Sequence, residues 1–117
     1  MPSVELLWWA GCPSHPEALA RLREELAAAG MDPSAVVLRE IRSEAAAEAA
    51  GFAGSPTIRI NGIDVVDPGD RPARLTCRVY RLRDGRVSAV PDRADIRDAL
   101  SDNAAGNRNR NQGGSRQ

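Results

Sequence analysis

The 117-residue chain lacks several features that mark particular classes of protein. It has no lysine, and its 16 arginines balance 16 acidic residues, so net charge gives no reason to expect a nucleic-acid partner. Its longest apolar stretch, Leu6 to Gly11, is far too short to cross a membrane, and the N-terminus shows no signal-peptide pattern. We therefore expect a cytoplasmic protein that binds neither nucleic acid nor membrane.

Cysteine and histidine are also scarce, with two of the former and one of the latter. Two cysteines cannot make a disulfide framework, and in a reducing compartment each is a candidate free thiol, either buried and inert or exposed and reactive. This limits the reactive side chains to Cys12 and Cys77, with His15 as the ordinary base near neutral pH.

The composition of the chain is that of one folded domain. Hydrophobic residues make up 42% and charged residues 27%, which is typical of a globular protein. From Asn103 onward the only apolar residues are two alanines, so this part cannot bury enough surface to order itself. We predict a domain over residues 1–102 and a disordered polar tail over residues 103–117.

Apolar spacing and turn residues divide the domain into short elements. In chain order we predict a strand within 4–9, a helix containing Leu19, Leu22, Leu26 and Ala29, a strand over 35–41, a helix over 44–50, strands over 57–60 and 63–66, a hairpin of 77–82 with 86–90, and a helix from Asp92. Asn61-Gly62 is a strong hairpin signal. The first β-α-β unit should be parallel, so we predict an α/β fold with one mixed four-stranded sheet covered by helices.

Two motifs in this framework resemble the thioredoxin-like superfamily. The segment Trp9-Ala10-Gly11-Cys12-Pro13-Ser14-His15 joins the first strand to the first helix, where these proteins carry Cys-x-x-Cys. Ser55-Pro56-Thr57, followed by Ile58-Arg59-Ile60-Asn61-Gly62, is similar to their cis-proline loop and hairpin. The resemblance covers roughly residues 4–66 and the final helix, and it implies a thioredoxin-like fold with an extra hairpin before that helix.

The resemblance also implies a site. Cys12 would be the active thiol, because a thiolate near a helix N-terminus is stabilised by free N–H groups. A cis Pro56 would present a backbone edge that holds an extended thiol-bearing substrate. The substrate-binding residues implied in this way are Trp9, Pro13, Ser55, Pro56 and Thr57.

The sequence departs from the family pattern at the second cysteine, which His15 replaces. No neighbouring thiol can then release a mixed disulfide formed on Cys12. The Gly-Gly-x-x-Asp glutathione clamp of glutaredoxins is absent as well, so we predict no cofactor.

The sequence allows two interpretations of His15. Ser14 to Glu17 forms a capping-box pattern that places Pro16 in the first helical turn and Cys12 two residues outside the helix. His15 is then either a catalytic partner that donates to the Cys12 sulfur or a surface residue of the first turn.

The sequence also allows two interpretations of Cys77. As a free cysteine it is by default a small buried hydrophobe. The alternative makes it a distal partner of Cys12, either as resolving thiol or as second ligand to a soft metal. Asp64, Asp67 and Asp70 are expected to be solvated loop and edge residues.

The leading functional hypothesis is thiol–disulfide exchange through Cys12, with Cys77 or an external thiol resolving the mixed disulfide. One alternative is a binding protein for soft metals such as mercury or organomercurials, of the kind grouped with alkylmercury lyases. Another is a non-catalytic interaction module. The sequence leaves the substrate and the oligomeric state open, and predicts no metal site beyond the two thiols.

Overall fold

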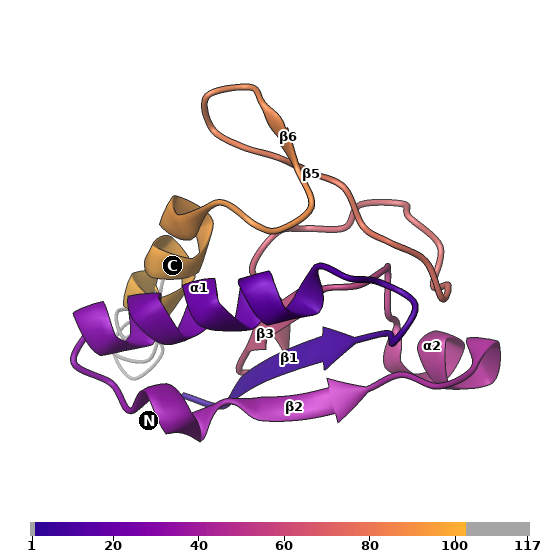
Figure 1. Cartoon of the computed structure of the whole chain (residues 1–117), viewed down its shortest axis with the longest axis horizontal. Helices are drawn as coiled ribbons and strands as arrows, with labels where there is room; N and C mark the ends of the chain where they lie inside the picture. The colour runs from indigo at the N-terminus through magenta and orange to yellow at the C-terminus, as the bar shows by residue number, and fades with distance from the viewer. Residues whose placement is uncertain (1, 103–117) are drawn as a thin grey trace, which may run out of the picture.

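The computed structural model describes residues 2–102 and contains a four-stranded mixed sheet in the order β2-β1-β3-β4 (Figure 1). Its strands are β1 (Val4–Trp8), β2 (Val37–Glu40), β3 (Thr57–Ile60) and β4 (Ile63–Asp64). The predicted tail, residues 103–117, lies outside the described residues. The mixed α/β class is therefore confirmed.

Strand directions follow from the connections. β1 pairs in parallel with β2, across the helix that links them, and antiparallel with β3. β3 and β4 form the predicted hairpin, in which Asn61 and Gly62 have φ values of 53° and 79°. A two-residue turn of this kind needs positive φ at both positions, which is why Asn-Gly predicted it correctly.

Helices cover both faces of the sheet, as alternation along β1 requires. Helix α1 (His15–Ala28) and the final described helix, residues 93–102, pack on one face, and α2 (Glu44–Ala50) packs on the other. Leu6 belongs to the cluster beneath α1, and its neighbour Leu7 belongs to the cluster with Phe52 and α2. The two apolar clusters fix the sheet between its helical layers.

Three predicted strand segments differ in their bounds, and one of them is the strand predicted over 63–66, which ends at Asp64 as β4. Residues 33–35 form a 3-10 helix, η1 (Pro33–Ala35), because the Asp32 side chain accepts from the Ser34 amide, so the second strand begins only at Val37. The predicted 77–82/86–90 hairpin pairs only as β5 (Tyr80–Arg81) with β6 (Val87–Ser88). It forms its own two-stranded sheet, so the prediction of one sheet was incomplete.

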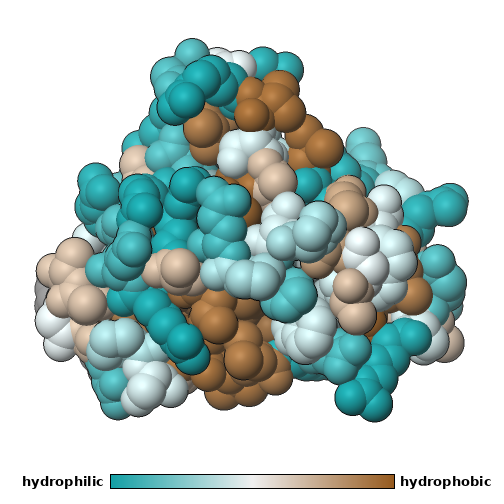
Figure 2. Space-filling model, in the orientation of Figure 1, coloured by the Kyte–Doolittle hydropathy of each residue, from teal (hydrophilic) through white to brown (hydrophobic). Residues whose placement is uncertain are grey.

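Exposed apolar side chains gather at two places. Val37 and Leu38 lie on the edge strand β2, and Val79 and Val87 lie on the β5–β6 segment, each at least half exposed. Figure 2 shows hydrophobic surface over β2 and over this hairpin. Within residues 2–102, no helix is long and apolar enough to cross a membrane.

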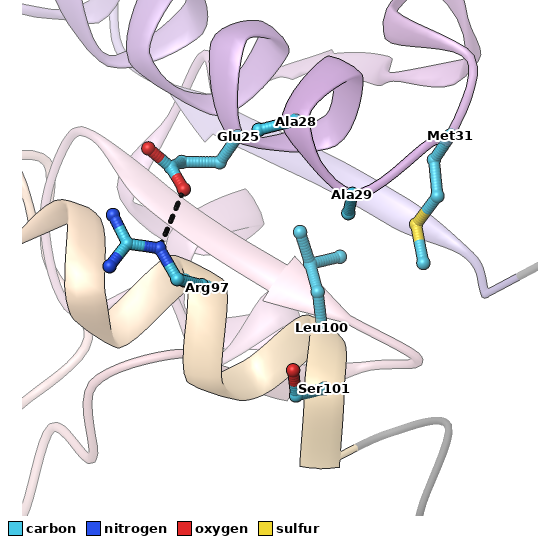
Figure 3. A pocket seen from close by; sticks show the side chains of 7 residues that line it. All are labelled: Glu25, Ala28, Ala29, Met31, Arg97, Leu100 and Ser101. Carbon is cyan, nitrogen blue, oxygen red and sulfur yellow. Dashed lines mark hydrogen bonds and ion pairs between the residues drawn. The ribbon is translucent and has the colours of Figure 1, made fainter.

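The final helix is anchored against the C-terminal end of α1. Ile96 and Leu100 are 0% and 2% exposed and belong to the cluster beneath α1. Arg97 Nε donates to Glu25 Oε1 at 3.2 Å, and Figure 3 shows this pair, with Ser101 one turn further along the final helix.

Replacing Ile96 by the smaller alanine therefore tests whether this helix belongs to the domain. We expect Ile96→Ala to lower the free energy of unfolding by about 2–5 kcal/mol, because it deletes fully buried methylenes and leaves a cavity. Urea denaturation measures the change, with Ser101→Ala, at an exposed position of the same helix, as the matched control within about 0.5 kcal/mol. Equal stability of the two variants would contradict the assignment.

Candidate functional site

Cys12 lies in the loop between β1 and α1, two residues before the N-cap residue Ser14. Its amide donates to the Trp9 carbonyl at 3.0 Å, and its thiol donates to the Ser55 carbonyl at 3.3 Å. The side chain is only 1% exposed. The predicted position outside the helix is thus confirmed, but the thiol is enclosed.

The opposite wall is the loop that precedes β3. The Ser55–Pro56 peptide bond is cis, as the sequence predicted, and it lies beside Cys12 through the Ser55 contact. The Ser55 hydroxyl accepts from the Trp9 amide at 3.0 Å, which joins this loop to the end of β1. The two motifs singled out in the sequence therefore meet.

A third segment lies along the same loop. The Ser55 amide donates to the Thr76 carbonyl at 2.8 Å, and the Arg78 amide donates to the Ser55 carbonyl at 2.9 Å. Cys77 is thereby paired with Ser55 as a single parallel bridge. Cys12 and Cys77 both lie against Ser55, and the interaction between the two thiols lowers the pKa of Cys12 and raises that of Cys77.

The pKa values of the two thiols are shifted in opposite directions. Burial raises the pKa of Cys12, but hydrogen bonds from the Ser14 amide, from Ser55 and Cys77, and from the Ser14 hydroxyl outweigh it and leave that pKa below its usual value. The hydrogen bond to Cys12 raises the pKa of Cys77, with smaller contributions from burial and from the Cys12 charge. In the reduced site Cys12 is the preferred thiolate and Cys77 its proton donor.

Cys77 is exposed, so its default reading as a small core hydrophobe is wrong. The strand-like alternation of the segment turns Arg78 and Tyr80 inward and leaves Cys77 and Val79 outward. The alternative reading, in which Cys77 approaches Cys12, agrees with the structure.

His15 does not approach the sulfur as a donor. Its Nδ1 donates to the Cys12 carbonyl at 3.1 Å, and its ring stacks on Trp8 with centroids 4.2 Å apart. The predicted capping box is also absent, because Ser14 adopts helical φ and ψ and its side chain makes no cap hydrogen bond. The Ser14 hydroxyl interacts with Cys12 instead. His15 thus positions the loop backbone.

Trp9 covers the loop from outside the strand. A Cβ on Gly11 would lie 2.4 Å from the Trp9 ring, so only glycine allows this close approach. Trp9 also packs against the cluster that contains Phe52. Both Trp8 and Trp9 are half-buried.

The implied substrate edge is not open. Ser55 and Thr57 are 0% exposed, Pro56 is fully buried, and both backbone groups of Ser55 are bonded to the 76–78 segment. In this closed arrangement Ser55, Pro56 and Thr57 present no free surface to a substrate. Pro13 is exposed at the loop surface.

Arg78 anchors the segment and was not singled out in the sequence. Its Nη1 donates to Asp64 Oδ2 at 2.7 Å and to Thr57 Oγ1 at 3.1 Å, and its Nη2 donates to the Val66 carbonyl at 2.7 Å. Asp64 is therefore a partner in a buried ion pair, which corrects its reading as a solvated residue, whereas Asp67 and Asp70 are exposed as expected.

Tyr80 fixes the other side of the proline. Its hydroxyl donates to the Pro56 carbonyl, and burial raises its pKa, so it stays a neutral donor. The Arg78 guanidinium lies 4.6 Å from the centre of the Tyr80 ring. Arg78, next to Cys77, and Tyr80, two residues further along, therefore hold the segment that carries Cys77.

The order of titration can be tested with single-thiol variants. We expect Cys12 in Cys77→Ser to titrate below an ordinary thiol, and Cys77 in Cys12→Ser to titrate closer to one. Removing the donor altogether in Cys77→Ala should raise the pKa of Cys12 above its value in Cys77→Ser, whose hydroxyl still donates. Alkylation rates with iodoacetamide across pH measure these values. A Cys12 pKa above the ordinary range in both Cys77 variants would contradict this order.

No protein-family model, curated protein or solved structure matches this chain. Among residues 2–102, no group of three or more histidine, cysteine, aspartate or glutamate side chains is arranged to hold a metal ion. The functional argument therefore rests on the geometry of the two thiols.

Proposed function

We propose that this chain is a thioredoxin-like thiol–disulfide oxidoreductase whose redox pair is Cys12 and Cys77. The observation that carries the proposal is the convergence of the two thiols on Ser55. The site then has a resolving thiol even though His15 stands where the family's second cysteine would be. A long-range partner replaces the missing local one.

The fold assignment is supported by the arrangement around the pair. A parallel β1-α1-β2 unit is followed by α2, an antiparallel β3–β4 hairpin and a final helix. The cis-proline loop faces the cysteine loop at the start of α1. These are the features that the resemblance in the sequence led us to expect.

The chemistry of such a pair is a two-electron exchange. A disulfide R–S–S–R takes two electrons from the dithiol, its S–S bond breaks, and a Cys12–Cys77 bond forms. The two thiol protons pass to the leaving sulfurs, which depart as two R–SH molecules. An external dithiol reverses the step and returns the protein to its reduced form.

A redox titration tests this proposal. The protein is equilibrated with mixtures of oxidised and reduced dithiothreitol, quenched with acid and alkylated, and its free thiols are counted by mass. We expect both thiols to disappear together along a two-electron curve. Independent loss of each thiol, or no loss over the whole range, would count against it.

A soft-metal site is the second candidate, because facing thiols also suit linear two-thiolate coordination. In that case the chain binds one Hg(II) with both thiolates and releases their protons. Equilibrium dialysis with Hg(II) in competition with a small dithiol measures this. Retention that depends on both cysteines, in a protein that forms no disulfide in the redox titration, would favour it.

A further inference from the structure

We propose that Cys77 is the thiol that attacks the disulfide substrate, and that Cys12 beneath it is the base and the resolving thiol. This inference rests on the proposed function and assigns the steps opposite to the order implied by the sequence motif. It also specifies a substrate class: disulfides that reach an exposed thiol without docking as an extended strand.

Access separates the two sulfurs. Thiol–disulfide exchange requires the attacked S–S bond to reach the attacking sulfur. Cys12 is 1% exposed and bonded to Ser55, whereas Cys77 is exposed. An incoming disulfide therefore meets Cys77 first, and it can meet Cys12 only after displacing the segment above.

That segment is firmly held. Its backbone takes both hydrogen-bonding groups of Ser55, and Arg78 is buried in an ion pair with Asp64. A Cβ on Gly54 would lie 3.0 Å from the Arg78 Cβ, so the two backbones also approach closely. Since residues 76–78 already occupy the edge, a substrate peptide cannot pair there. Cys77 thus lies at the backbone edge of the cis-proline loop, where the resemblance implied that the thiol of an extended substrate would lie.

The steps balance with one proton taken from water. The Cys77 thiol gives its proton to the Cys12 thiolate as its sulfur attacks R–S–S–R, which forms a Cys77–S–S–R bond and releases R–S⁻. The proton then passes from Cys12 to R–S⁻ to give R–SH. Cys12 attacks the Cys77 sulfur, the Cys12–Cys77 bond forms, and a second R–S⁻ leaves and takes a proton from water.

The two thiols interact in the reduced site. This contact lowers the pKa of Cys12 and raises that of Cys77, so a proton released by Cys77 as it attacks has an acceptor beside it. The base and the attacking thiol are thus already paired in the reduced site.

The test uses bis(2-hydroxyethyl) disulfide, a small neutral disulfide, on the full chain. In Cys12→Ser, we expect a stable mixed disulfide to accumulate on Cys77, because no thiol remains beneath it. In Cys77→Ser, we expect adduct formation at least about tenfold slower, because the remaining sulfur is enclosed. Intact mass at timed acid quenches measures both rates, and Cys12→Ala repeats the first arm if the serine variant melts early.

Brief exposure of the wild-type protein to the same disulfide provides the second part of the test. The first adduct, mapped on peptides, should lie on Cys77 and convert to the Cys12–Cys77 disulfide. A first adduct on Cys12, together with a faster reaction of Cys77→Ser than of Cys12→Ser, would overturn the inference but leave the redox pair intact. Absence of any intramolecular disulfide in the wild type would instead reject the proposed function.

Discussion

The Cys77→Ser variant should lose at least about 100-fold of the wild-type turnover of a small disulfide in the presence of an external dithiol. An intramolecular thiol acts at a very high effective concentration, which a millimolar external thiol cannot match. The variant also keeps only the enclosed thiol, Cys12. The loss is measured as the rate of R–SH release per mole of protein.

A displaced thiol provides the control. Ser101 is exposed and lines a pocket together with Ala28 and Ala29 at the C-terminal end of α1 (Figure 3), whereas Cys12 precedes the N-terminal end of that helix. Adding Ser101→Cys to the Cys77→Ser variant restores the number of thiols but not their placement, and should not restore turnover. Full activity in either variant would mean that Cys77 takes no part.

Arg78→Met should lower the free energy of unfolding by about 3–5 kcal/mol. Removing one partner of a buried ion pair leaves the other charge without compensation. Here Asp64, with its side chain 11% exposed, would lose its ion-pair partner, and Thr57 and the Val66 carbonyl would lose a donor. The same change should slow disulfide exchange, because Arg78 holds the residue next to Cys77.

Two comparisons distinguish this effect from a general loss of arginine. Arg86→Gln removes an exposed ion pair with Asp84 and should change stability by no more than about 0.5 kcal/mol. Adding Asp64→Leu to Arg78→Met removes the unpaired carboxylate and should recover much of the loss. Equal unfolding free energies for Arg78→Met and the wild type would contradict the anchoring role.

The parts of the fold that the sequence predicted correctly are governed by local chemistry. Ser43 caps α2 through its hydroxyl, Gly51 ends it in the left-handed conformation, and Asn61-Gly62 forms the tight turn. The capping box at Ser14 does not form, because that hydroxyl interacts with Cys12, two residues earlier in the loop, and not with the helix.

Only part of the candidate site could be predicted from the sequence. Cys12 and the cis Pro56 follow from motifs, but the position of Cys77 depends on how the loop after β4 returns to Ser55, which no spacing in the sequence fixes. One signal was present: alternation in Cys77-Arg78-Val79-Tyr80 places Arg78 on the same face as a tyrosine, where an arginine needs a buried acid. That pattern calls for a buried acid, which the structure shows to be Asp64, and it turns Cys77 outward.

Peptide mapping of the oxidised wild-type protein tests the central claim most directly. The reduced protein is treated with one equivalent of bis(2-hydroxyethyl) disulfide, quenched with acid, digested without reductant and analysed by mass spectrometry. We expect one cross-linked peptide pair that joins Cys12 to Cys77 within a single chain, and its disappearance on reduction. Separate adducts on the two cysteines, or cross-links only between chains, would contradict the account.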